Sequence, residues 1–305
     1  MKRILFPCFL FLIFLVNAQD NFKYQTPHKD ILDLVLAKPT PFVSTDDKAE
    51  WMLLLERSDF PTIEELSQPE LRIAGLRINP NNFGPSRAGS SVNIQIKNVK
   101  SGQLFSIEGL PEKLRASAVQ WSPDQKSFAF TNTTNSNIDL YVVGLSTRKA
   151  RKINTTPLNT VLGGSYQWVN NNLIVYKTII PNKALTVKQG APTGPIVQEN
   201  LGKSAASRTY QDLIKNPFDE ALFEYYATAQ LVKNDLNKET PIGQPAIYRS
   251  FSLSPDKNYI LTTTIDKPFS YLVPANGFPH TVAVISINGE LMKTIAKNPS
   301  SEGQP

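Results

Sequence analysis

Cysteine is almost absent from this chain of 305 residues, which contains only Cys8. This residue lies in the apolar run "ILFPCFLFLIFLV", which follows Lys2 and Arg3 and leads to Ala18. A positive start, an apolar centre and a small final residue are typical of a secretory signal that is removed, here after Ala18. The mature chain, residues 19–305, would then contain no cysteine, which excludes disulfide bonds and thiolate metal sites.

Long apolar runs are missing from the rest of the chain. A membrane-spanning helix needs about 20 apolar residues in succession, and no segment after Ala18 approaches that length. The run before Ala18 is itself too short and too early for a membrane span. We therefore expect an exported protein, periplasmic or secreted, with no membrane partner once its signal is cleaved near Ala18.

Histidine is scarce too, with only His28 and His280. A nucleophilic serine needs a base within hydrogen-bond reach, and a third group must orient that base. The G-x-S-x-G turn that carries such a serine in many hydrolases does not occur, because segments 84–89 and 163–166 have the wrong spacing. We assign no catalytic residue and interpret His280 as a loop residue. No metal cluster, phosphate loop or cofactor motif stands out, so we predict no cofactor and no metal site.

Neither sign of charge dominates the composition. The 32 Lys and Arg exceed the 26 Asp and Glu by 6, and removal of Lys2 and Arg3 with the signal would lower the net charge from +6 to +4. The basic residues are scattered, which argues against a nucleic-acid partner. An apolar content of 41% supports a large core, while 23 prolines and 15 glycines indicate many turns.

One hairpin phrase recurs along the chain, at residues 42–55, 119–132, 166–178 and 251–264. Its clearest versions are "VQWSPDQKSFAFTN" and "FSLSPDKNYILTTT". Proline presets the φ angle of a tight turn, and the following aspartate can accept hydrogen bonds from nearby backbone N–H groups. We therefore interpret Asp124 and Asp256 as turn residues rather than catalytic ones.

A second alternating hairpin follows each phrase, at residues 92–107, 138–153, 227–242 and 281–295. The last contains Asn288-Gly289, the strongest short hairpin signal. Four antiparallel strands per unit, repeated every 40 to 50 residues or so, are typical of propeller blades. Blades bury both faces only when they stack around an axis. The sequence therefore predicts an all-β fold, a partial β-propeller of about four four-stranded antiparallel blades with short helical insertions.

Two helical insertions are expected, near 58–78 and 205–228. In the first, Thr62 and Glu65 are spaced as a capping box. In the second, Asn216 suits the N-cap and is followed by a proline at the first helical position.

Two tyrosines, Tyr225 and Tyr226, fall on this second expected helix. Their spacing fits packing on the propeller and also allows contact with substrate, and we favour packing.

Several stretches resemble one family of enzymes. They are the Ser-Pro-Asp phrases, "RIAGLRINP" (72–80), "RTYQDLIKNPFDEALFEYYATAQL" (208–231) and "KPFSYLVPANGFPHTVAV" (267–284). Over nearly all of residues 19–305 the chain resembles the N-terminal propeller of the prolyl oligopeptidase family of serine peptidases, in its glutamyl endopeptidase-like branch. The resemblance implies a propeller that caps an α/β-hydrolase domain, admits small or unfolded peptides, and serves cleavage after acidic residues.

The chain departs from that family because it ends soon after its fourth blade and lacks the catalytic serine turn. We expect a signal peptide at 1–18 and a partial propeller at 19–305, without the C-terminal α/β-hydrolase domain. Whether the chain is itself an enzyme stays open, while a full-length relative would be a serine-type endopeptidase. The predicted function is the non-catalytic, substrate-gating part of an exported serine peptidase. The alternative is a stand-alone periplasmic interaction propeller.

Arg115 and Arg249 precede strands expected to line the central channel. Positive charge at these places could steer acidic peptides inward. The alternative interpretation is two solvated loop arginines. The expected partners are a peptide substrate and the missing hydrolase domain.

Overall fold

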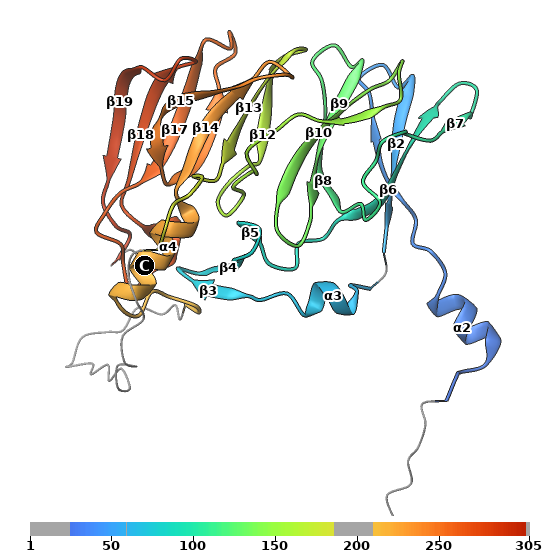
Figure 1. The fold of residues 1–305 in the computed structure, drawn as a ribbon, viewed down its shortest axis with the longest axis horizontal. Helices are drawn as coiled ribbons and strands as arrows, with labels where there is room; N and C mark the ends of the chain where they lie inside the picture. Colours follow the sequence, from blue (N-terminus) through green and yellow to red (C-terminus); the bar gives the residue numbers. More distant parts are fainter. Residues whose placement is uncertain (1–24, 59, 186–209, 303–305) are drawn as a thin grey trace, which may run out of the picture. The chain divides into compact units, whose positions relative to one another are not determined.

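The computed structural model describes residues 25–58, 60–185 and 210–302. The predicted signal, 1–18, lies outside these ranges, so its cleavage stays a prediction. The chain divides into two units, Met1–Lys38 and Pro39–Pro305. Helix α2 (Lys29–Val35) belongs to the first unit, and every strand belongs to the second (Figure 1).

The second unit consists of four successive antiparallel blades, each with its strands paired in chain order. Blade 1 contains β1 (Phe42–Thr45), β2 (Trp51–Arg57), β6 (Ser91–Asn98) and β7 (Leu104–Phe105). Blade 2 contains β8 (Ala116–Trp121), β9 (Ser127–Thr133), β10 (Ile138–Gly144) and β11 (Ala150–Lys152). Blade 3 contains β12 (Tyr166–Asn170), β13 (Leu173–Thr178), β14 (Ala229–Asn234) and β15 (Glu239–Ala246). Blade 4 contains β16 (Tyr248–Leu253), β17 (Tyr259–Ile265), β18 (His280–Ser286) and β19 (Leu291–Asn298).

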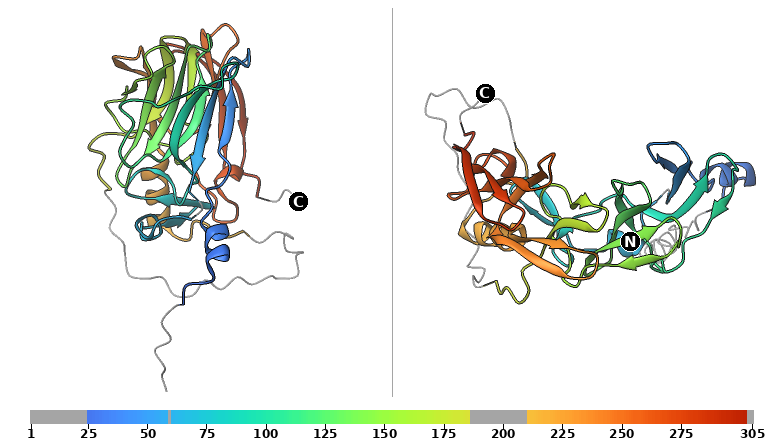
Figure 2. Two further views of the ribbon diagram at one scale, coloured as in Figure 1. Left: turned by 90° about the vertical axis from the view of Figure 1, so that its right-hand side faces the viewer. Right: turned by 90° about the horizontal axis from the view of Figure 1, so that it is seen from above.

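This order confirms the predicted partial propeller. Each of the four predicted hairpin phrases forms the first two strands of a blade, and each second hairpin forms the last two. The pairing of Ser91 with Ala116 joins blades 1 and 2 into a single sheet of eight strands. Figure 2 shows the blades standing side by side in chain order.

The Ser-Pro-Asp phrase works as a turn, as predicted. The Asp124 carboxylate accepts from the Ser122 hydroxyl at 2.7 Å and from the Lys126 backbone N–H at 3.1 Å. In blade 4, Asp256 accepts from the Ser254 hydroxyl in the same way. These short-range hydrogen bonds close the hairpin, because they satisfy turn groups that the strand ladder leaves unpaired.

Apolar clusters fill the spaces between blades. Leu53 and Phe128 belong to the cluster between blades 1 and 2. Ala129 and Ile174 belong to the next cluster, and Val175 and Ile260 to the one between blades 3 and 4. Blades 2 and 3 thus send alternate side chains of one strand to their two neighbours, since successive residues of a strand point to opposite faces.

Three insertions form a cap at one end of the blades (Figure 1). Each connects the second and third strands of its blade. The first contains α3 (Ile63–Leu66), β3 (Leu71–Ile73), β4 (Leu76–Asn79) and β5 (Gly84–Pro85); the second ends in α4 (Pro217–Ala227); the third contains the short helix η2 (Ala275–Gly277).

A common apolar core holds these insertions together. It includes Ile73 of the first insertion, Phe223 of the second, and Phe269 and Phe278 of the third. The backbone also links them, because the Ala275 N–H donates to the Ala74 carbonyl at 2.8 Å. Segments far apart in the sequence therefore fold as one cap.

The first insertion differs from its prediction as helical over 58–78. Among its described residues only α3 is helical, with the predicted capping box between Thr62 and Glu65, and residues 71–79 form the β3–β4 hairpin. The hairpin turns at Ala74 and Gly75, whose φ angles are 53° and 74°. Residues that alternate apolar and polar on either side of such a turn form strands. The helical interpretation missed this alternation.

The second insertion follows its prediction more closely. Helix α4 begins at Pro217, and the Asn216 side chain accepts from the Asp219 backbone N–H at 2.9 Å. Residues 210–216 are not helical, and 205–209 lie outside the described ranges. Tyr226 packs on Phe83 with ring centroids 5.1 Å apart, which favours the packing interpretation of this tyrosine.

The outer face of blade 4 lacks a neighbour among the described residues. Leu53, Ala129 and Val175 hold one equivalent position in blades 1 to 3 and are each 0% exposed. Leu261 holds that position in blade 4 and is 43% exposed. Ile295 on the adjacent part of the sheet is 54% exposed. The outer face of blade 4 therefore exposes apolar side chains at a position that is buried in the other three blades.

We expect the chain on its own to self-associate through this face, because exposed apolar sheet surface promotes association. The Leu261→Lys variant should shift sedimentation velocity profiles toward the monomer. Leu272→Lys, at an exposed leucine of the cap, should leave the profile unchanged. A wild-type chain that is monodisperse, monomeric and cooperative in its melting would contradict the expectation.

Candidate functional site

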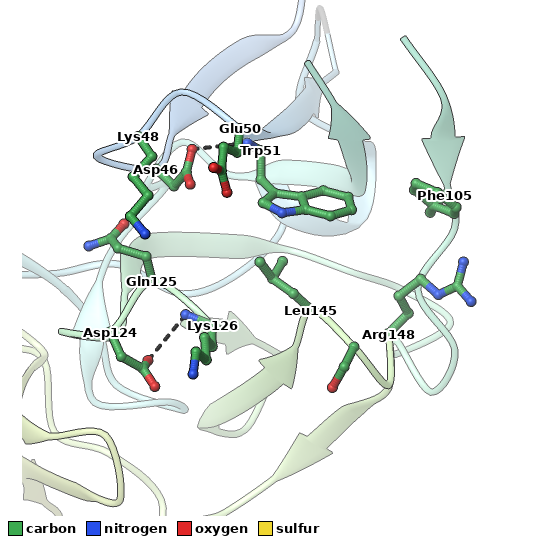
Figure 3. Close-up of a pocket in the computed structure, with 11 residues that line it drawn as sticks. Asp46, Lys48, Glu50, Trp51, Phe105, Asp124, Gln125, Lys126, Leu145 and Arg148 are labelled. Atoms are coloured by element: carbon green, nitrogen blue, oxygen red, sulfur yellow. Dashed lines mark hydrogen bonds between the residues drawn. The ribbon is translucent and has the colours of Figure 1, made fainter. Parts of the chain in front are cut away.

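A pocket of about 560 Å³ opens between blades 1 and 2, at the end of the blades where the hairpin turns lie (Figure 3). Its lining comes from the β1–β2 turn, the β8–β9 turn and the β10–β11 turn, with residues of β2 and β7 beside them. The pocket is therefore built from segments that only the stacking of blades brings together.

Apolar side chains form one wall of the pocket. Trp51 is the first residue of β2 and Phe105 the last of β7, and their ring centroids lie 6.1 Å apart. Leu145 lies beside Trp51, and the Arg148 guanidinium lies 4.7 Å from the Phe105 centroid (Figure 3). Strand β7 has only two residues, so it leaves both rings half-buried. An arginine over an aromatic face adds a cation–π attraction.

Charged side chains of both signs surround this wall. Asp46 is buried, and its carboxylate accepts from the Trp51 backbone N–H at 2.9 Å. The Ser122 hydrogen bond lowers the pKa of Asp124 below its usual value, so this carboxylate stays ionised at neutral pH. Lys48 and Lys126 are exposed and have no ion pair among the described residues. The pocket therefore offers an apolar wall beside charges of both signs.

The histidines do not form a catalytic pair with serine in the described ranges. The His280 ring contacts the Phe278 carbonyl at 3.0 Å and the Asn298 amide at 3.1 Å. His28 caps helix α2, where it accepts from the Asp30 backbone N–H at 3.5 Å. Both rings therefore have structural contacts.

The two arginines chosen from the sequence lie in different blades and have different surroundings. Arg115 directly precedes β8; its Nε donates to the Thr133 carbonyl at 2.7 Å, and its guanidinium lies 3.7 Å from the Glu65 carboxylate. Arg249 is the second residue of β16, is half-buried, and has no ion pair among the described residues. No described hydrogen bond joins the two arginines.

Lys177 is an unusual buried cation that the sequence reasoning missed. It lies on β13, is 1% exposed, and donates to the Leu162 carbonyl. Burial lowers the pKa of Lys177 to about 7 because the charged ammonium loses its hydration. Lys177 follows four consecutive apolar residues, 173–176, near the end of β13, and its charged side chain gave no signal of burial.

Within 25–58, 60–185 and 210–302, no group of three His, Cys, Asp or Glu is placed to hold a metal ion. None of the helices in those ranges has both the length and the apolar character required to cross a membrane.

Curated proteins of known name match this sequence closely. The probable chloroplastic glutamyl endopeptidase of Oryza sativa subsp. japonica is 33% identical over 298 residues, which cover 92% of this chain and 32% of the relative. That of Arabidopsis thaliana is 30% identical over 297 residues, covering 92% and 31%. The chain thus spans about a third of the length of these relatives. No family model matches the chain.

Two peptidases are among the solved structures that align with this chain. An acylaminoacyl peptidase of Pyrococcus horikoshii aligns with a TM-score of 0.46 at 12% identity, over 87% of this chain and 33% of that one. The β-propeller domain of the trilobed protease of Pyrococcus furiosus aligns with a TM-score of 0.42 at 11% identity, over 85% and 59%.

The sequence match extends over all four blades and the cap, because it covers 92% of the chain. It confirms the resemblance that the hairpin phrases and the 208–231 segment predicted. Over about a third of their length, this chain is similar to the glutamyl endopeptidases of rice and Arabidopsis.

Proposed function

We propose that this chain is the non-catalytic, substrate-gating propeller part of an exported serine peptidase of the glutamyl endopeptidase type. The observation that carries the proposal is the 33% identity to the rice relative over 92% of the chain. The catalytic serine, aspartate and histidine would belong to an α/β-hydrolase domain in the remaining polypeptide. The chain itself would bind and admit peptides without cleaving them.

Gating follows from the stiffness of stacked blades. Apolar clusters lie between all four blades, so the sheets resist separation. A folded domain of 100 residues has a radius of gyration of about 13 Å, whereas an extended peptide is one strand wide. A passage framed by packed blades would therefore admit extended peptides and exclude folded proteins.

Arg249 and Arg115 are proposed to steer acidic peptides toward this passage. Arg249 is the stronger candidate because its guanidinium has no carboxylate partner among the described residues. Arg115 is already engaged by Glu65, which lowers the positive charge it can offer.

A chimera tests the gating role. This chain would replace the aligned third of the rice relative, and cleavage of a Glu-linked chromogenic peptide would be compared with cleavage of a folded protein. We expect the chimera to cleave the peptide and spare the folded protein, while the chain alone hydrolyses neither. The Arg249→Ala variant should weaken cleavage after Glu more than it weakens folding.

Two results would count against the proposal. Hydrolysis by the chain alone would place catalysis within it. Equal cleavage of folded and unfolded substrates by the chimera would remove the gating role. Unchanged cleavage by the Arg249→Ala chimera would end only the steering role.

Export remains part of the proposal. A positively charged start and an apolar run precede Ala18. Amino-terminal sequencing of protein recovered outside the cytoplasm should begin at Gln19; an intact Met1 would contradict it.

The second candidate is a stand-alone interaction propeller. The pocket of about 560 Å³ with its Trp51 and Phe105 wall favours it, because such a pocket can bind a partner without a peptidase domain. The reading frame after Pro305 separates the candidates. A G-x-S-x-G turn with later Asp and His supports the peptidase, and a stop codon without a hydrolase gene supports the interaction propeller.

A further inference from the structure

Helix α3 presents its apolar side chains to solvent. Phe60, Ile63 and Leu66 are 63%, 87% and 48% exposed. Ile63 and Leu66 are three residues apart on α3 and therefore lie on one side of this short helix, while Phe60 precedes its N-cap Thr62 by two residues. A helix that packs on its own domain shows the opposite arrangement, with apolar residues facing the core.

The acidic residues of α3 fasten it to blade 2. The Glu64 carboxylate lies 3.1 Å from the Lys113 ammonium and accepts from the Asn135 amide at 2.5 Å. Glu65 lies 3.7 Å from the Arg115 guanidinium, and both of these side chains are mostly buried. These contacts lie on the charged side of α3, so they favour the orientation in which its apolar side faces away from blade 2.

The described ends of the second unit lie at the same rim as α3. At the start, the Arg57 guanidinium donates to the Thr40 carbonyl, just where β2 leads into the first insertion. At the other end, the Ser301 N–H donates to the Gly277 carbonyl of the cap at 2.9 Å. Polypeptide joined to either end would emerge beside the cap, and the curated relatives have about two thirds of their length outside the matched part.

We propose that α3 is a docking helix, and that Phe60, Ile63 and Leu66 contact an apolar surface of the α/β-hydrolase domain. This inference rests on the proposed function. It gives Arg115 a positioning role, because Arg115 holds Glu65 and thereby orients the helix. Exposed apolar patches on an otherwise polar surface typically mark such contact sites.

The same chimera with the rice relative provides the test, now with the triple variant Phe60→Ser, Ile63→Ser and Leu66→Ser. The readouts are the rate of tryptic cutting at the junction between the two parts and the radius of gyration from small-angle scattering. The matched control is Leu104→Ser, Leu291→Ser and Met292→Ser, three exposed apolar residues near the turns at the opposite end of the blades.

We expect the α3 variant to be cut at least about tenfold faster than wild type, a factor that corresponds to ~1.4 kcal/mol of lost docking, and to have a larger radius. Arg115→Ala should act in the same direction, while the control triple variant should match wild type. Surface changes rarely unfold a protein, so the α3 variant should keep the wild-type melting temperature.

Equal cutting rates and radii in wild type and the α3 variant would overturn the docking role, even if folded substrates are still excluded. If the wild-type chain associates with itself through α3 and the triple variant abolishes this association, the apolar side of α3 binds a second copy of the chain. That result would also overturn docking on the hydrolase domain. Loss of substrate exclusion with intact docking would refute the proposed function alone.

Discussion

Replacing Phe223 with alanine is expected to lower the free energy of unfolding by about 3–5 kcal/mol, the usual cost of emptying a buried aromatic site. Phe223 is 0% exposed on α4 and meets Phe269 and Phe278 edge to face, with centroids 5.0 and 5.4 Å away. All three insertions contribute to its surroundings. The cavity would therefore weaken the cap as a whole rather than α4 alone.

Chemical denaturation measures the loss of stability, and amide hydrogen exchange locates it. The Ala275 N–H and the Gly75 N–H both donate across insertions, to the Ala74 and Asp212 carbonyls. We expect both amides to exchange faster in Phe223→Ala. Lys215→Ala, an exposed site just before α4, should stay within about 0.5 kcal/mol of wild type. Unchanged exchange at Ala275 and Gly75 would show that the insertions do not fold as one cap.

Stability should rise with pH between about 7 and 10 because of Lys177. Its pKa is lowered to about 7 in the folded chain, whereas an unfolded lysine has a pKa of about 10.4. Between these pH values Lys177 is protonated in the unfolded chain and neutral in the folded chain. Raising the pH therefore destabilises the unfolded chain relative to the folded one. The slope is at most about 1.4 kcal/mol per pH unit, and the full effect is on the order of 5 kcal/mol.

The Lys177→Met variant should be more stable than wild type at pH 7 and should show a much shallower rise up to about pH 9.5. A smaller rise should remain because burial also lowers the pKa of Lys183. Loss of the hydrogen bond to the Leu162 carbonyl would cost only about 1 kcal/mol. Burial raises the pKa of Tyr166 in the folded chain. Above about pH 10 this tyrosine would therefore ionise in the unfolded chain but not in the folded chain, which would lower the free energy of unfolding again. Measurements should therefore stop below that pH.

Thermal or denaturant unfolding at several pH values measures whether stability depends on the protonation of Lys177. Lys238→Met, at an exposed turn between β14 and β15, serves as the control and should keep the wild-type slope. A wild-type profile that is flat from pH 7 to about 9.5 would show that Lys177 stays charged when folded.

Structure that depends on neighbours in the chain was predictable from the sequence. The Ser-Pro-Asp turns, the capping box of α3 and the Asn216 cap all form as predicted, because each is closed by hydrogen bonds over at most five residues. Blade order followed from repeated alternation, which period-two strands impose locally. The β3–β4 hairpin was missed although its alternation was visible, because a helical character was assigned to the whole insertion.

The candidate sites depended on contacts that no local pattern shows. Arg115 was chosen as a steering residue, but its partner Glu65 lies in an insertion of another blade. The pocket wall of Trp51 and Phe105 requires β2 and β7 to pair on either side of β6. Burial of Lys177 requires the Leu162 loop to cover it.

By itself the sequence determined four blades, their turns and the similarity to glutamyl endopeptidases, since hairpin segments and sequence similarity are properties of the chain order. Only the tertiary structure decided that three insertions share one core and that α3 faces outward. The reason is physical: both results arise from side chains distant in sequence, whose apolar contacts and ion pairs form only after the blades have stacked.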